Sequence, residues 1–290
     1  MNKTLYLECY SGISGDMTVA ALLDLGADEK VLREVLDSLP LDGYHVEISR
    51  VLKSGIDACD FNVVLENQDN HDHDMEYLYG HLHDHTHGHE HTHEHNHEHG
   101  HEHTHEHNHE HGHNHAHGHH EHRGMKEITE IINKGKMTDG ARAYALRIFD
   151  ILAHAESKAH NVPVEEVHFH EVGAVDSIVD IVAIAVCLDN LDIKDCVVTN
   201  LTEGKGTVRC QHGILPVPVP AVLNIVSDNH IPIEITDITG ELVTPTGAAV
   251  VAAIATTHEL PKTFTVVKTG LGAGKRRYEC AGILRAMIIE

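Results

Sequence analysis

The chain has 290 residues, 41% of them hydrophobic, and a formal net charge of −24 with histidine counted as neutral. This acidity excludes the broad basic surface that binds a phosphate backbone, so we expect no nucleic-acid partner. Residues 1–10 lack the apolar stretch of a signal peptide, and the apolar run at 181–188 is too short to cross a bilayer. Six cysteines without a C-x-x-C pair are typical of free thiols. We therefore expect a cytoplasmic protein with no membrane partner.

The first 66 residues show both helix and strand patterns. TLYLECY predicts a strand, and the Gly/Ser turn SGISGD leads into a helix that ends near Gly26. A second short helix is expected over residues 29–38. Residues 44–66 alternate in polarity, which predicts two strands joined near Ser54 and Gly55.

The composition then changes abruptly. Every odd-numbered position from 81 to 119 is histidine, and a twelve-residue unit beginning HTHEHNHEHGH at residue 91 recurs at residue 103. The segment 67–123 has few apolar residues with which to form a core, so we expect a disordered His-rich insert. Residues 1–66 and 124–290 would then form one domain around it.

Helices and strands alternate after the insert. Helices are expected over 125–133, from Thr138 onward, over 177–191, and after Pro220 and Thr246. Strands are expected at CVVTNL, GTVRC, PIEI, TFTVV and ILRAMII. This order predicts an α+β fold, a mixed α/β domain interrupted by the insert.

The His-rich insert predicts metal binding. Neutral imidazole is a good ligand for nickel, zinc, copper and cobalt, although the affinity order by itself does not select nickel. A solubilising low-complexity segment is the alternative explanation. The repeats supply the candidate ligands His91, His93, His95, His97, His103, His105, His107 and His109.

A second cluster lies in HFHEVGAVDSIVDI, residues 168–181. His168 and His170 point to one side of an extended segment, Glu171 follows, and Asp176 and Asp180 lie on one face of the next helix. These five residues could converge on a divalent ion. Alternatively, Asp176 only caps the helix and the histidines bond the backbone.

Three glycine-rich segments could hold a phosphate or other anion at a turn or a helix N-terminus. None matches the P-loop pattern, and a tight turn is the alternative for each. Asp16, just inside the first helix, could orient a metal. The candidate anion-binding residues are Gly12, Ser14, Gly15, Thr246, Gly247, Gly270, Gly272, Gly274 and Lys275.

His212 precedes a segment stiffened by prolines at 216, 218 and 220. Those prolines fix an extended path and a helix start. His212 is therefore a candidate site residue, with a structural histidine as the equal alternative.

Five segments in order, ECYSGISGDM, HFHEVGAVDSIVDI, GTVRCQHGILPVPVPA, GELVTPTGAA and TGLGAGKR, resemble the LarC family of nickel-insertion proteins. The resemblance spans nearly all of the chain outside the insert, and family members commonly carry a His-rich insert at this place. It implies a nickel chelatase or cyclometallase of the lyase class. Such a protein uses CTP to insert Ni²⁺ into pyridinium-3,5-bisthiocarboxylic acid mononucleotide, forming the nickel-pincer cofactor of lactate racemase.

The reaction needs a supply of Ni²⁺, a phosphate site and a base for the ring proton. The insert, the glycine-rich segments, and His170, Glu171 or His212 are the respective candidates. Mg²⁺ or Mn²⁺ is a further candidate cofactor. The resemblance associates CTP binding with a C-terminal region that this chain lacks, so we expect a separate C-terminal partner polypeptide. A nickel store or delivery protein without catalysis is the alternative, and the oligomeric state, a homo-oligomer included, stays open.

Overall fold

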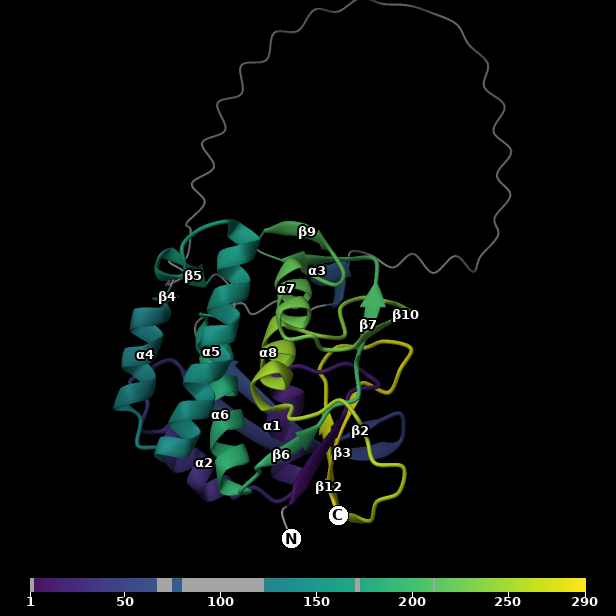
Figure 1. The fold of residues 1–290 in the computed structure, drawn as a ribbon. Helices are drawn as coiled ribbons and strands as arrows, with labels where there is room; N and C mark the ends of the chain where they lie inside the picture. Colours follow the sequence, from purple (N-terminus) through teal and green to yellow (C-terminus); the bar gives the residue numbers. More distant parts are fainter. Residues whose placement is uncertain (1–2, 67–74, 80–122, 170–172, 211) are drawn as a thin grey trace, which may run out of the picture.

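The computed structural model describes residues 3–66, 75–79, 123–169, 173–210 and 212–290 (Figure 1). Their helices and mixed sheet confirm the expected α+β class. The histidines at 81–119 lie outside the described residues, as do His170 and Glu171. Inside the expected insert, residues 75–79 form a short helix, α3 (Met75–Tyr79), whose Leu78 is buried in the core.

A six-stranded sheet with the order β2-β3-β11-β12-β1-β6 forms one layer of the fold. Strand β1 pairs antiparallel with β12 and parallel with β6, so the two ends of the chain lie side by side (Figure 1). The strands are β1 (Thr4–Glu8), β2 (Tyr44–Lys53), β3 (Ile56–Leu65), β6 (Asp195–Val197), β11 (Val266–Ala273) and β12 (Ile283–Ile289).

The β2–β3 hairpin was predicted correctly. Its register runs without interruption from Tyr44 opposite Leu65 to Lys53 opposite Ile56. Ser54 and Gly55 have φ values of 52° and 81°. Two consecutive positive φ values are what a two-residue hairpin turn requires.

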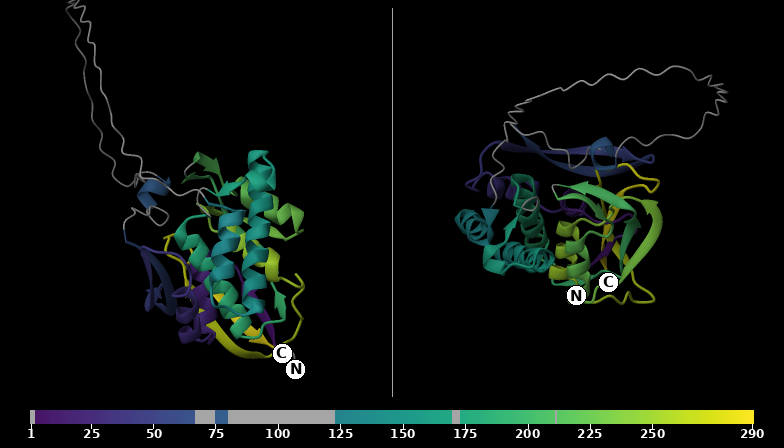
Figure 2. Two further views of the ribbon diagram at one scale, coloured as in Figure 1. Left: turned by 90° about the vertical axis from the view of Figure 1, so that its left-hand side faces the viewer. Right: turned by 90° about the horizontal axis from the view of Figure 1, so that it is seen from above.

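Helices cover one face of the sheet in two further layers (Figure 2). Helix α1 packs on β3, β11 and β12, and α6 packs on α1. Helix α5 packs in turn on α4, α6, α7 and α8. The remaining helices, besides α3, are α1 (Gly15–Asp24), α2 (Glu29–Leu36), α4 (Met125–Lys134), α5 (Asp139–His160), α6 (Val175–Asn190), α7 (Pro220–Asp228), α8 (Pro245–Ile254) and the 3₁₀ turn η1 (Val164–Glu166).

Helix α1 lies unusually close to the sheet because β11 presents glycines to it. A Cβ on Gly270 would lie 2.4 Å from the Ala21 carbonyl oxygen, and one on Gly272 would lie 2.0 Å from the Met17 carbonyl oxygen. The segment expected as a glycine-rich turn is therefore largely a strand. Its glycines have a packing role, namely to admit the backbone of a helix.

Three two-stranded pairs complete the fold: β7 (Leu201–Lys205) with β10 (Ile233–Thr239), β4 (Arg123–Gly124) with β5 (His168–Phe169), and β8 (Thr207–Cys210) with β9 (Gly213–Pro216). The single strand expected at CVVTNL is thus two strands, β6 and the start of β7, that lie in different sheets.

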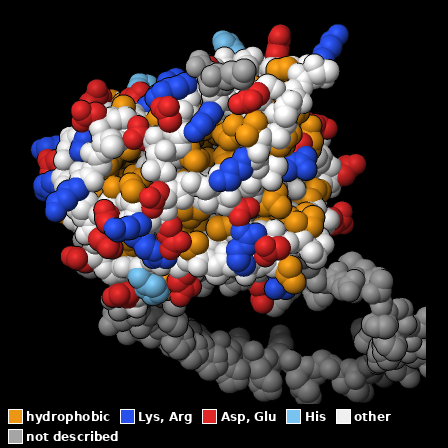
Figure 3. All heavy atoms as spheres, turned by 90° about the horizontal axis from the view of Figure 1, so that it is seen from below, with side chains coloured by type: hydrophobic (Ala, Val, Ile, Leu, Met, Phe, Trp, Pro, Cys, Tyr) orange, Lys and Arg blue, Asp and Glu red, His pale blue; other side chains and the backbone are white. Residues whose placement is uncertain are grey.

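The core lies between the sheet and the helices and includes the fully buried Phe61, Phe149 and Phe169. Helix α6 is buried on all sides from Ile181 to Leu188, which explains its continuous apolar sequence. On the face seen from below, acidic and basic side chains alternate around apolar ones (Figure 3).

Candidate active site

The loop before α1 and the loop before α8 lie against each other. Ile13 N–H donates to the Leu242 carbonyl at 3.0 Å, and Thr244 N–H donates to the Ile13 carbonyl at 3.1 Å. Gly12 has φ +82°, and a Cβ there would lie 2.0 Å from the Leu242 oxygen. Likewise, a Cβ on Gly247 would lie 2.2 Å from the Ile13 carbonyl oxygen. These glycines bring two helix N-termini together.

Three aspartates meet beside these N-termini. Asp16 lies in the first turn of α1, Asp176 in the first turn of α6, and Asp180 one turn further along α6. Ser14 Oγ donates to Asp16 Oδ1. Asp176 was a candidate helix cap, but Ala174 occupies the N-cap position and Asp176 lies inside the helix.

Asp16 and Asp180 are short of compensating groups among the described residues. Burial raises the pKa of Asp180 well above its usual value, and the charges of Asp16 and Asp176 raise it further, while Lys275 opposes the rise. Asp16 Oδ2 and Asp180 Oδ1 are buried and have no hydrogen-bond partner among the described residues. Buried carboxylate oxygens of this kind are what a bound divalent cation would satisfy.

The aspartate cluster is not a preformed metal site. Within the described ranges, no three His, Cys, Asp or Glu side chains already surround a common point as metal ligands. The aspartates supply only oxygen atoms, which suit Mg²⁺ or Mn²⁺ better than the softer transition metals.

Basic side chains border the aspartates. Lys275 Nζ forms an ion pair with Asp60 at 2.5 Å, and both side chains are mostly buried. Lys53 Nζ donates to the Gly274 carbonyl at 2.7 Å, and burial followed by the charge of Arg277 lowers its pKa. These cations lie where β11 ends, so the anion-binding role expected of the segment would fall to its lysine end.

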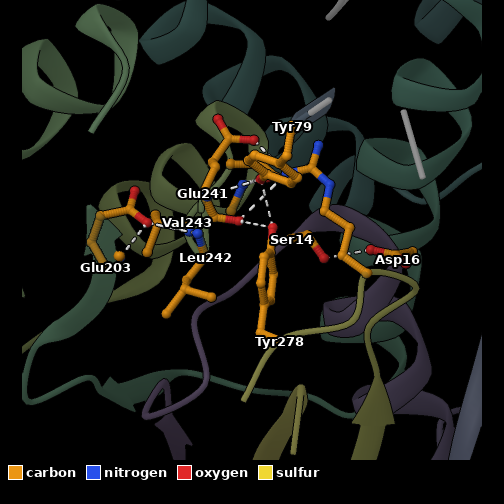
Figure 4. Close-up of polar contacts among 12 residues, drawn as sticks. Ser14, Asp16, Tyr79, Glu203, Glu241, Leu242, Val243 and Tyr278 are labelled. Carbon is orange, nitrogen blue, oxygen red and sulfur yellow. Dashed lines mark hydrogen bonds and ion pairs between the residues drawn. The ribbon is translucent and has the colours of Figure 1, made fainter. Parts of the chain in front are cut away.

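A second polar network adjoins the first (Figure 4). Arg276 Nη1 pairs with the Glu241 carboxylate at 2.6 Å, and both are mostly buried. Tyr278 Oη donates to the Glu241 carbonyl at 2.8 Å and lies 2.7 Å from Tyr79 Oη. Tyr79 Oη also accepts from Glu241 N–H at 3.0 Å. Tyr79 is the last described residue before the histidines at 81–119, so this network fixes the chain where that part of the insert begins.

Arg123–Gly124 fixes the other end. It forms β4, which pairs with β5, and Arg123 Nη1 donates to the Gly173 carbonyl at 3.1 Å. Both ends of the insert are therefore anchored to the motifs that form the site.

Glu203 is a functional candidate that the sequence analysis missed. It is fully buried, and its Oε1 accepts from the N–H groups of Gly204, Leu242 and Val243 at 2.8, 2.6 and 3.1 Å (Figure 4). Burial raises the pKa of this carboxyl to about 7, although the N–H donors oppose the rise. An acid among the buried residues of β7 was the available signal, but two of its partners, Leu242 and Val243, lie 39 and 40 positions away.

The remaining predicted residues are dispersed. Gly12, Ser14, Gly15, Thr246 and Gly247 lie at the paired helix N-termini. His168 is exposed on β5. His212 lies on the β8–β9 hairpin, beside Cys210 and with its ring centroid 4.9 Å from that of His160. The anion-binding and catalytic roles of these residues stay predictions.

The chain was compared with known proteins. Residues 5–290 match the family model of the nickel insertion protein. A pyridinium-3,5-bisthiocarboxylic acid mononucleotide nickel insertion protein from Alkaliphilus metalliredigens is 52% identical over 290 residues, which are 100% of this chain and 61% of that protein. Proteins of the same name from Clostridium acetobutylicum and Acetivibrio thermocellus are 41% and 35% identical, each over 99% of this chain and over 64% and 60% of their own lengths.

The chain thus spans about three fifths of the length of these curated relatives. No solved structure matches it. Among the helices that the structure describes, none has the length and apolar character needed to cross a membrane.

Proposed function

Because the chain belongs to the nickel insertion protein family, we propose that it inserts nickel into pyridinium-3,5-bisthiocarboxylic acid mononucleotide. One observation carries the proposal: segments far apart in the sequence converge on buried aspartates. Asp16, Asp180 and Lys275 come from three separate motifs, and the Glu241 loop adds a fourth. The product would be the nickel-pincer cofactor of lactate racemase-type enzymes, and the reaction would be that of a cytoplasmic lyase.

The substrate phosphate would bind at the paired N-termini of α1 and α8. The helix dipoles favour an anion there, and the close contacts of the glycines at 12 and 247 bring the two N-termini together. Lys275, whose charge acts on Asp180, would neutralise part of the substrate's charge.

Nickel is the second substrate, and the insert would supply it. Its histidines, His91–His97 and His103–His109 among them, are suitable ligands that exchange metal readily. Because Tyr79 and Arg123 hold the ends of the insert at the site, the released ion would enter at a high local concentration.

Asp16, Asp176 and Asp180 would hold Mg²⁺ or Mn²⁺, and the unsatisfied oxygens of Asp16 and Asp180 fit such an ion. A bound ion of this kind would neutralise the phosphates of CTP. The rest of the CTP site would lie in the region of the relatives that this chain does not match. His170 or Glu171, directly before α6, would take the ring proton.

The test is anaerobic incubation of the chain with Ni²⁺, the mononucleotide and CTP, with and without a polypeptide matching the rest of the relatives. The nickel-pincer product should form, and Asp180→Asn should lower its rate at least about 100-fold. Asp189→Asn is the matched control, since Asp189 lies on the same helix and bonds Thr138 at its far end. Full activity in Asp180→Asn would show that the aspartates are structural.

The His-rich composition favours a second candidate, a nickel store without catalysis. Replacing residues 80–122 by a Gly/Ser linker distinguishes the two functions. An insertion enzyme keeps its activity when excess free Ni²⁺ is supplied, whereas a store loses most of its metal capacity and all of its function.

A further inference from the structure

A group of softer metal ligands lies apart from the aspartates. Cys210 ends β8, His212 precedes β9, and His160 is the last residue of α5. We propose that Cys210, His212 and His160 form a second metal site, which takes a borderline-soft divalent transition ion such as Ni²⁺. The proposal goes beyond the insertion reaction, because metal binding at this site can be measured independently of that reaction.

The Cys210–His212 pair has nearly the spacing that a shared ion requires. Cys210 Sγ lies 3.9 Å from His212 Nδ1. A tetrahedral ion with metal–sulfur and metal–nitrogen bonds of about 2.3 and 2.05 Å places those two atoms about 3.6 Å apart. An ion would therefore draw the pair together by a few tenths of an ångström. Both side chains are accessible from solvent, so an ion can enter.

His160 completes the group. Its ring centroid lies 4.9 Å from that of His212, and the planes are tilted by 38°. Its Nε2 lies 3.4 Å from the Glu156 carboxylate, one helical turn earlier. A carboxylate behind a histidine is the usual arrangement for a metal-ligating imidazole, because it fixes the ring and raises its basicity. The C-terminal end of α5 adds a favourable dipole for a cation.

Two imidazoles and a thiolate differ in kind from three carboxylates. Nitrogen and sulfur ligands favour nickel, cobalt or zinc, whereas the carboxylates favour harder ions. No complete set of ligands is preformed among the described residues, so small side-chain movements are needed. Three protein ligands would leave the fourth position of a tetrahedral ion open. An incomplete, open site suits transfer of an ion better than its storage.

The position supports transfer. Helix α3 packs against β8, and the β8–β9 hairpin lies at the same end of the molecule as α3 and the β4–β5 pair (Figure 1). Helix α3 and β4 are the two described ends of the His-rich insert. An ion released by the insert would therefore meet Cys210, His212 and His160 near the points where the insert joins the fold.

Cobalt titration of the full chain tests the site. Cobalt bound to thiolate has an intense near-ultraviolet charge-transfer band that cobalt bound only to histidine lacks. The insert contains no cysteine, so its metal does not contribute. Under anaerobic conditions with a non-thiol reductant, the wild-type chain should develop this band. The band should saturate at about one equivalent of Co²⁺ in addition to the Co²⁺ that the insert binds. Excess Ni²⁺ should replace the band.

Matched variants locate the ligands. Cys210→Ser should abolish the band, whereas Cys280→Ser, which changes the other partly exposed cysteine, should keep it. His160→Gln and His212→Gln should each weaken Co²⁺ binding at this site about 10-fold or more. His45→Gln, at an exposed histidine on β2, should have no effect. Circular dichroism checks that each variant is folded.

A measurement on the wild-type chain tests the proposal even if a variant fails to fold. Bound Zn²⁺ should protect Cys210 from alkylation and leave Cys280 reactive, as measured by mass spectrometry of the peptides. The proposal is overturned by absence of the band in the wild type, by an unchanged band in Cys210→Ser, or by equal alkylation of Cys210 with and without Zn²⁺.

Discussion

Gly15 and Asp180 are in such close contact that a Cβ on residue 15 would lie 2.4 Å from Asp180 Oδ2. The glycine thus allows the carboxylate of α6 to reach the N-terminus of α1, where the Asp16 N–H bonds it. The aspartate cluster therefore requires a residue without a Cβ at position 15.

Gly15→Ala should therefore displace Asp180 and abolish cation binding by the cluster. Mg²⁺ is the suitable probe, because it prefers carboxylates and leaves the imidazoles of the insert unoccupied. Mg²⁺ should raise the thermal unfolding temperature of the wild type but not that of Gly15→Ala.

Gly140→Ala is the control. There a Cβ would lie 2.0 Å from Asp189 Oδ1, a similar clash with a carboxylate outside the cluster. This variant should keep the Mg²⁺ effect. An equal response of Gly15→Ala and the wild type would mean that Mg²⁺ binds elsewhere.

Glu203 should make the protein less stable as the pH rises. Its pKa is about 7 in the folded chain and near 4.5 when unfolded, so the folded state holds a proton that the unfolded state releases. The stability that this provides is complete below pH 4.5 and is lost as the pH rises to about 7. The loss is at most about 3.5 kcal/mol, at about 1.4 kcal/mol for each pH unit between the two values.

Urea unfolding of wild type and Glu203→Gln between pH 4.5 and 8 measures the effect. The variant should show a flatter dependence of its unfolding free energy on pH. Glu47→Gln, at an exposed carboxyl on β2, should keep the wild-type slope. Identical slopes for wild type and Glu203→Gln would remove Glu203 as the cause.

Tyr79→Phe should loosen the attachment of α3. The change removes the bond to Tyr278 and leaves the Glu241 N–H without its acceptor, which costs about 1–3 kcal/mol locally. Hydrogen exchange should accelerate at Glu241. Tyr44→Phe is the comparison, because Tyr44 Oη donates to the Leu36 carbonyl and links β2 to α2. Unchanged exchange at Glu241 would show that the hydroxyl of Tyr79 is dispensable.

Replacing residues 80–122 by a Gly/Ser linker should leave the fold intact, because the described residues at both ends have their own contacts. The number of Ni²⁺ ions bound at neutral pH should fall several-fold, while the unfolding temperature changes by a few degrees at most. Equilibrium dialysis and calorimetry measure the two quantities. A large loss of stability would mean that the insert belongs to the core.

Local signals in the sequence predicted most of the elements. The Ser54-Gly55 hairpin and the start of α5 at Thr138 depend on turn and cap chemistry, which acts over a few residues. Gly270 and Gly272 were misread as a turn, although their spacing of two places them on one face of a strand. Glycine is required on that face of the strand because α1 packs directly against it.

Some residues of the candidate site could be selected from the sequence alone. Asp16, Asp180 and Lys275 were singled out from their motifs, but their meeting follows from the fold. Glu203 and Tyr79 could not be found by spacing, since Leu242 and Tyr278, their partners, are distant in sequence.

The pairing of β1 with β12 sets an order of events during synthesis. Strand β1 is made first, yet its neighbour β12 spans residues 283–289, so the sheet under α1 closes only when these residues have left the ribosome. The histidines at 81–119 emerge much earlier. Under the proposed function, a nascent chain would therefore carry nickel on its insert before the site that receives the metal has formed.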